Sequence, residues 1–191
     1  MATHASIANR TALPTTGTQL FLLNKRTGVM FEVPCVTSIG DISVENEMED
    51  ITCIRDTARR YQAQMASASQ TSFGMYFNAY NPESVRLFNA RRDKDEFVVA
   101  LAFPEFDADG LLVSADDASK PTVDITTDPS NPMFELTDER IYLVFDAAVV
   151  SFPISGEVAA NFSSTLTLQI NGDPELAPES ALPDLTLPTE P

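Results

Sequence analysis

The stretch NPESVRLFNARRDKDEFVVALAF, residues 81–103, joins the signal of a helix to the signal of a buried strand. Asn81 is a good N-terminal cap, and Pro82 suits the first helical position because it has no backbone N–H to leave unpaired. Glu83 complements the positive end of the helix dipole. Together these residues predict one short helix over residues 82–92.

The helix is expected to end on Arg91 and Arg92, because cations are favoured in the last turn. Val85 and Phe88 stand three residues apart and, joined by Leu87, give the predicted apolar stripe of this helix. The run 97–103 that follows is apolar without alternation, which is typical of a strand buried on both faces.

Most of the remaining chain has the pattern of β-strands. Apolar or alternating runs bounded by turn residues predict strands over residues 18–24, 28–33, 35–39, 71–79, 141–152 and 162–171. Residues 42–49 alternate between apolar and polar side chains, and residues 51–61 are interpreted as the return strand of a long hairpin. The predicted fold class is mainly β: a β-sandwich or partly closed barrel with one short α-helix, a long exposed hairpin and extended termini.

Composition divides the chain into three parts. Residues 1–14 are predicted to be a polar N-terminal arm, and residues 15–172 a single β domain. Within that domain, residues 104–132 form a long acidic loop region with short strands in it. Residues 173–191 are a Pro-rich acidic C-terminal tail, with too few apolar side chains to make a core.

The charges are segregated along the sequence. Ten basic and eleven acidic residues lie up to position 103, which gives a net charge of −1, whereas two basic and seventeen acidic residues follow, which gives −15. Because opposite charges attract across interfaces, one part of a copy should attract another part of a second copy. The distribution favours assembly over catalysis.

The overall net charge of −16 argues against several classes of partner. It repels phosphates, so neither nucleic acid nor anionic lipid is expected to bind. The sequence has no run of about 18 apolar residues and no apolar signal-peptide segment, so we expect a chain that folds in the cytoplasm without a membrane. Cys35 and Cys53 have apolar neighbours and are predicted to be inert core thiols.

Catalysis by the common routes finds no support. His4 is the single histidine and lies in the N-terminal arm, so Ser-His and Cys-His nucleophilic schemes have no buried base. No glycine-rich phosphate loop is present. We therefore expect no enzymatic activity and no cofactor.

One acidic segment comes close to the calcium-loop spacing of an EF-hand. Its candidate ligands are Glu105, Asp107, Asp109 and Asp116. A strand ending in Pro104 precedes the segment, whereas an EF-hand needs a helix there. An acidic Asp-Gly turn is the favoured interpretation, and no metal is expected.

A row of carboxylates marks the first strand of the predicted hairpin. Glu45, Glu47 and Glu49 alternate with other residues, which puts them on one face of a strand. Like charges in a row cost stability. The row is therefore either a solvated strand face or an electronegative wall.

The succession of elements resembles a known family. Thr16-Gly17-Thr18-Gln19-Leu20 opens a strand, Phe31-Glu32-Val33 leads to Val36-Thr37-Ser38-Ile39, the Glu-rich segment runs into Asp50-Ile51-Thr52, and Asn81-Pro82-Glu83 opens the helix before the closing strands. Over residues 15–172 this order resembles the tail tube (major tail) proteins of long-tailed bacteriophages. The likeness rests on order and spacing, not on a signature motif.

The resemblance implies a structural virion protein that polymerises as stacked hexameric rings into a hollow tail tube. DNA would pass through the acidic lumen during ejection without specific binding. The implied partners are the chain itself and other tail proteins, and the implied place is the virion tail, assembled in the host cytoplasm. The long hairpin would contact the neighbouring ring.

This role assigns functions to the charged residues. The candidates for contacts with acids of a neighbouring copy are Arg55, Arg59, Arg60, Arg91 and Arg92. Glu45, Glu47 and Glu49 are candidates for either the lumen wall or the face between rings. Two rival roles share the β-sandwich and stay open: an immunoglobulin-like adhesion or decoration module, and the tube protein of a contractile secretion system.

Overall fold

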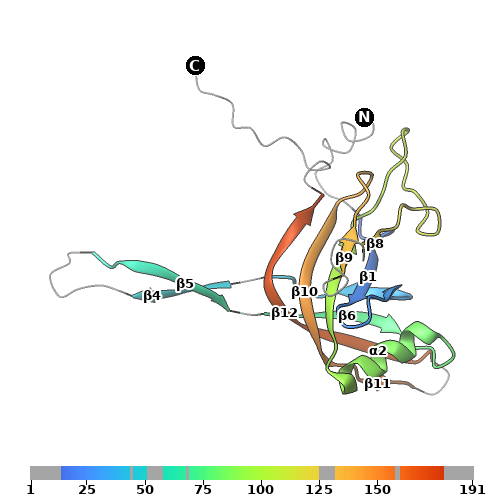
Figure 1. The fold of residues 1–191 in the computed structure, drawn as a ribbon, viewed down its shortest axis with the longest axis horizontal. Helices are drawn as coiled ribbons and strands as arrows, with labels where there is room; N and C mark the ends of the chain where they lie inside the picture. Colours follow the sequence, from blue (N-terminus) through green and yellow to red (C-terminus); the bar gives the residue numbers. More distant parts are fainter. Residues whose placement is uncertain are drawn as a thin grey trace.

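The structure is a computed structural model that describes residues 14–43, 45–50, 58–67, 69–124, 132–157 and 160–178 (Figure 1). Its main sheet contains β1 (Gln19–Asn24), β2 (Met30–Glu32), β3 (Val36–Ile39), β6 (Gln70–Tyr76), β7 (Glu96–Ala102), β10 (Tyr142–Ser151), β11 (Ile154–Ser155) and β12 (Ser163–Ala177). All pairings are antiparallel, in the order β2-β1-β7-β10-β12-β6-β3, and β11 pairs with β12.

The sheet curls around one core without closing. β2 and β3 are the two ends of the strand order and do not pair with each other, so the sheet is not closed into a barrel. Leu20 and Leu22 near one end nevertheless share a core cluster with Phe73 and Met75 near the other end. The mainly β, sandwich-like fold predicted from the sequence is confirmed.

β7 lies between β1 and β10 and is buried on both faces, as its unbroken apolar run predicts. Phe97, Val99 and Leu101 enter the main core. Ala100 and Ala102 belong to a second cluster on the other face of the sheet. That cluster is covered by a two-stranded sheet of β8 (Thr122–Asp124) and β9 (Met133–Glu135), whose Phe134 packs against it.

The helix α2 (Pro82–Asp93) forms where the sequence predicts it, but it presents a different face to the core. Ser84, Leu87 and Ala90 are buried, whereas Val85 and Phe88 are exposed. The predicted apolar stripe is therefore wrong for Val85 and Phe88 and confirmed for Leu87. The small side chains three residues before and after Leu87 let the helix approach the sheet closely enough for Leu87 to join the main core.

The long hairpin stands away from the main sheet (Figure 1). It consists of β4 (Glu45–Asp50) and β5 (Tyr61–Ser67), which pair with each other in a sheet of their own. The predicted return strand over residues 51–61 is wrong, because Asp50 pairs with Tyr61 and the return begins only there. Register depends on where the turn falls, and the weak periodicity of this segment did not show it. Residues 51–57, with Cys53 and Arg55, lie outside the described residues.

The last strand continues beyond its predicted end at residue 171. β12 reaches Ala177, which pairs with Tyr142. The pairing shifts register between Val144 and Asp146, so Gly172 (φ +87°) and Pro174 fall in a bulge. A bulge tolerates a proline because the ladder hydrogen bonds are already interrupted there.

Cys35 is exposed, so the prediction of a core thiol is wrong for this residue. It lies in the turn between β2 and β3, with its backbone in the left-handed region at φ 50°. Val33 is buried in the core and the half-buried Val36 packs against it, and the turn between these two residues leaves Cys35 exposed.

Candidate assembly surfaces

The exposed face of α2 combines apolar and basic side chains. Val85 is 38% and Phe88 42% exposed. The guanidinium carbon of Arg91 lies 5.7 Å from the centroid of the Phe88 ring, a cation–π arrangement. Arg92 lies beside them, its Nε 3.1 Å from Asp93 Oδ1, and its side chain is 73% exposed. We call Val85, Phe88, Arg91 and Arg92 the helix patch.

The start of α2 is fixed by the residue that predicts it, and its end by Lys94, which the sequence pattern did not single out. Asn81 Oδ1 accepts a hydrogen bond from the Glu83 N–H at 2.8 Å, which caps the N-terminus. Lys94 adopts the left-handed conformation, and its N–H donates to the Ala90 carbonyl oxygen, which ends the helix. The helix patch is therefore held on a rigid, capped element.

The other predicted assembly residues lie on the hairpin. Arg59 and Arg60 are exposed and immediately precede β5, and Arg59 Nη1 lies 3.4 Å from the Tyr61 hydroxyl. Glu45, Glu47 and Glu49 lie in β4, with Glu45 opposite Ser67 and Glu49 opposite Gln62. Figure 1 places the hairpin and α2 on different sides of the sheet, so the predicted basic residues form two separate surfaces.

The acidic loop is fixed to the sheet by Arg140, which is 2% exposed. Its Nη1 donates to the Ser119 carbonyl oxygen at 3.0 Å, and its Nη2 donates to the carbonyl oxygens of Phe103 at 2.8 Å and Gly17 at 3.2 Å. Burial lowers the pKa of the Arg140 guanidinium, and nearby negative charge, including that of Glu105, opposes this shift. One buried cation thus joins the acidic loop, the segment just before β1 and the residue that follows β7.

Sequence reasoning did not single out Arg140, although a signal was present. It is one of two basic residues in the strongly acidic second part, and it directly precedes the apolar strand that begins at residue 141. A lone cation next to a buried strand has few ways to remain solvated, so it needs acceptors in the fold.

The four calcium candidates are not brought together. Glu105 Oε2 accepts the Ser119 N–H at 2.7 Å, and Asp107 Oδ1 accepts the N–H groups of Asp109 at 3.0 Å and Leu111 at 2.8 Å. These two carboxylates hold the loop itself. Within the described part of the chain, no three His, Cys, Asp or Glu side chains are grouped so as to hold a metal ion. The structure has the favoured Asp-Gly turn, with Gly110 at φ +77°.

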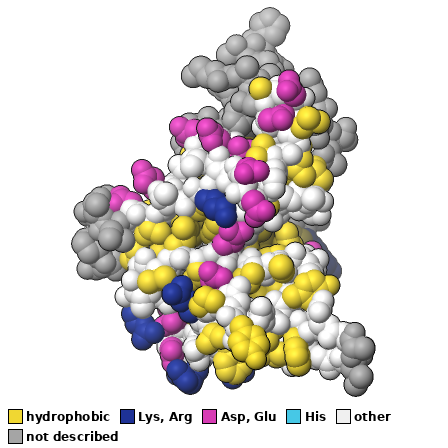
Figure 2. All heavy atoms as spheres, turned by 90° about the vertical axis from the view of Figure 1, so that its right-hand side faces the viewer, with side chains coloured by type: hydrophobic (Ala, Val, Ile, Leu, Met, Phe, Trp, Pro, Cys, Tyr) yellow, Lys and Arg dark blue, Asp and Glu magenta, His cyan; other side chains and the backbone are white. Residues whose placement is uncertain are grey.

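The acidic loop also exposes two kinds of side chain. Leu111 is 66% and Leu112 38% exposed, and Asp109 and Asp116 are exposed as well. We call these four residues the loop patch. Figure 2 shows acidic side chains gathered mostly in the upper part of one face of the molecule, and basic ones mostly toward its lower end.

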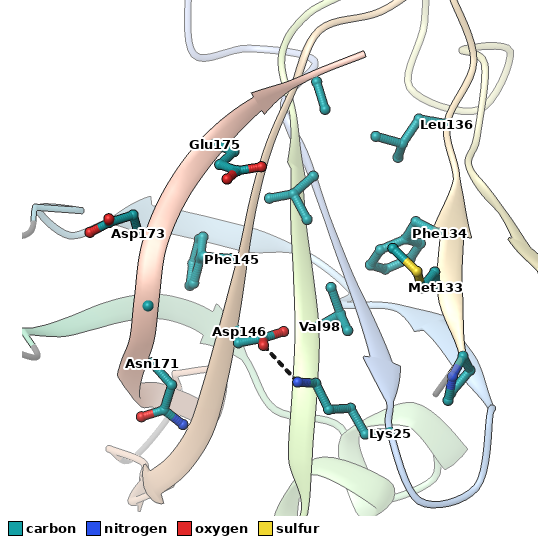
Figure 3. A pocket seen from close by; sticks show the side chains of 14 residues that line it. Lys25, Val98, Met133, Phe134, Leu136, Phe145, Asp146, Asn171, Asp173 and Glu175 are labelled. Carbon is teal, nitrogen blue, oxygen red and sulfur yellow. Dashed lines mark hydrogen bonds and ion pairs between the residues drawn. The ribbon is translucent and has the colours of Figure 1, made fainter. Parts of the chain in front are cut away.

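An open groove of about 440 Å³ lies on the outer face of the sheet, between β9 and β12 (Figure 3). Lys25 Nζ lies 2.6 Å from Asp146 Oδ2 at its floor. Asp173 and Glu175 also line the groove, and Lys25 is the one cation among the described residues that do so. The groove is net negative, which disfavours phosphate-bearing ligands.

No helix in the described ranges is long and apolar enough to cross a membrane.

The sequence matches the model of the family described as phage tail tube, TTP, lambda-like, over residues 11–180. It is 24% identical over 174 residues to Structural protein 3 of Pseudomonas phage PAJU2, and the match covers 91% of this chain and 99% of that protein.

Two solved structures share the fold. A chain of the anti-feeding prophage baseplate superposes with a TM-score of 0.57 at 10% identity, covering 88% of this chain and 97% of that one. A chain of the SPP1 tail tube superposes with a TM-score of 0.56 at 13% identity, covering 84% and 77%. The family match covers well over half of the chain, so the chain belongs to the lambda-like phage tail tube family and is a structural protein of the phage tail, not an enzyme.

Proposed function

We propose that this chain polymerises as stacked rings of six subunits into the hollow tail tube that conducts DNA during ejection. Membership of the tail tube family supports self-assembly. The observation that carries the stacking of rings is the β4–β5 hairpin, which pairs with itself and stands away from the main sheet.

A two-stranded hairpin that stands away from the main sheet is stabilised by packing against another surface. A two-stranded sheet is marginally stable in water, because it cannot bury enough apolar area by itself. Contact with the adjoining ring would supply that area. In this arrangement Arg59 and Arg60, which precede β5, and Arg55 meet acidic side chains of the adjoining copy.

The acidic excess supports a lumen that does not hold DNA. Each Lys or Arg contact with phosphate would add affinity and slow the passage of DNA, whereas carboxylates repel the backbone. Glu45, Glu47 and Glu49 line either this wall or the face between rings. The partners are then the chain itself and other tail proteins, with no membrane involved and with assembly in the host cytoplasm.

A tube of a contractile injection system is the second candidate, favoured by the fold likeness, with a TM-score of 0.52 at 10% identity, to a chain of the sheath-tube complex of an extracellular contractile injection system. The lambda-like family match favours the long-tailed phage.

Negative-stain electron microscopy of the purified chain tests the proposal. Rings or hollow tubes are expected, and a dispersed monomer at high concentration would contradict it. The variant Arg59→Glu/Arg60→Glu should keep the subunit folded and shorten or abolish the tubes. Arg86→Glu, an exposed arginine on α2 outside the helix patch, is the matched control and should still give tubes.

A further inference from the structure

The helix patch and the loop patch lie at opposite ends of the same strand. α2 ends at Asp93, just before β7 begins at Glu96, and the acidic loop follows the end of β7 at Ala102. A strand rises about 3.3 Å per residue, so the seven residues of β7 separate the two patches by about 20 Å. Within one copy they cannot touch.

The helix patch has the composition of a protein interface. Scattered exposed apolar residues are normal, but here Val85 and Phe88 are neighbours on one helix face and have Arg91 and Arg92 beside them. Aromatic and arginine side chains are the types enriched at the centre of interfaces.

The loop patch complements the helix patch both in apolar surface and in charge. Leu111 and Leu112 offer apolar surface, and Asp109 and Asp116 offer carboxylates. The loop is also held in shape before any partner arrives, by Arg140 at its base and by the Asp107 carboxylate in its turn. A preorganised surface loses less entropy on binding.

We propose that the helix patch of one copy docks on the loop patch of a second copy. Arg91 and Arg92 face Asp109 and Asp116, while Phe88 and Val85 cover Leu111 and Leu112. The contact rests on the proposed self-assembly and names two of its surfaces. Because it joins two different patches, it repeats from copy to copy and generates a closed ring or a continuing stack.

A charge swap in the full chain tests the contact. Arg91→Glu/Arg92→Glu should leave the subunit folded, with a thermal unfolding midpoint lowered only slightly by the loss of favourable charge at the end of the helix. It should raise the critical concentration for polymerisation, followed by sedimentation and microscopy, at least about tenfold. Asp109→Arg/Asp116→Arg should have the same effect. Combining all four substitutions should restore polymerisation.

The control is Asp173→Arg/Glu175→Arg, which makes the same change of charge on exposed residues of β12. It should neither block polymerisation nor rescue the helix variant. Rescue by this control, or no rescue by the four-residue swap, would overturn the proposed pairing.

The apolar half of the contact has a test without a change of charge. Phe88→Ser should raise the critical concentration about tenfold with little loss of stability. If the wild type forms tubes and both helix variants form them equally well, the contact is overturned while the tail tube function stands. A wild type that forms neither rings nor tubes would overturn both.

Discussion

Arg140 donates two hydrogen bonds to the main-chain carbonyl oxygen of Phe103, from Nε at 3.0 Å and from Nη2 at 2.8 Å. The two residues flank the whole segment 104–139 between β7 and β10. The Phe103 N–H donates to the Ile141 carbonyl oxygen at 3.0 Å beside them. The two ends of the long acidic loop are therefore held together by the buried Arg140 side chain.

Replacing this cation should be costly. Arg140→Met removes the guanidinium donors from the carbonyl oxygens of Phe103 and Ser119, each worth about 1–3 kcal/mol, so we expect a loss of about 3 kcal/mol in the free energy of unfolding. Urea unfolding followed by circular dichroism measures it. Arg86→Met, on the exposed face of α2, should change stability by less than about 0.5 kcal/mol. Equal stability of the two variants would contradict this role.

Tyr142 should make stability depend on alkaline pH. Burial raises the pKa of its phenol above the ordinary value of about 10, although the hydrogen bond with Thr137 opposes the shift. The folded state favours the neutral phenol. Its contribution is therefore fully present below pH 10 and is lost as pH rises through the folded-state pKa.

Urea unfolding at pH 8 and pH 11 measures this dependence. Tyr142→Phe should lose less stability than the wild type between these two values. The matched control is Tyr80→Phe, since Tyr80 is 98% exposed, and it should follow the wild type. Parallel curves for all three proteins would exclude the effect.

The orientation of α2 predicts unequal effects of two adjacent truncations. Leu87→Ala removes a fully buried side chain from the main core and should cost about 2–5 kcal/mol in the free energy of unfolding. Phe88→Ala removes a larger but partly exposed side chain and should cost less than about 1 kcal/mol. Chemical denaturation of both variants gives the comparison. The opposite order would restore the stripe that the sequence predicts.

Calcium should not bind to the acidic loop. The carboxylates of Glu105 and Asp107 already accept hydrogen bonds from the backbone N–H groups of Ser119 and Leu111, and calcium would have to compete with these donors. Isothermal titration calorimetry with millimolar calcium is expected to give no binding heat. Saturable heat that disappears in Asp107→Asn would show that a site forms in solution.

The sequence predicted an element correctly where a residue type strongly prefers one position in a helix or strand. Asn81 and Pro82 locate the start of α2, and the uninterrupted run 97–103 identifies the doubly buried strand. The return strand of the hairpin was misplaced, because its position depends on register with β4 and not on its own weak pattern.

The sequence by itself determined that the chain is mainly β with one capped helix, and that its charge is divided between a near-neutral and an acidic part. Helix capping, the alternation of apolar and polar residues, and charge are local properties, and they can be recognised from consecutive residues. The tertiary structure alone decided that Leu87 faces the core and Phe88 faces outward, because that choice depends on the shape of the sheet beneath the helix. It also decided that Arg140 closes the base of the acidic loop, because its guanidinium meets the Phe103 carbonyl oxygen only where β10 pairs with β7.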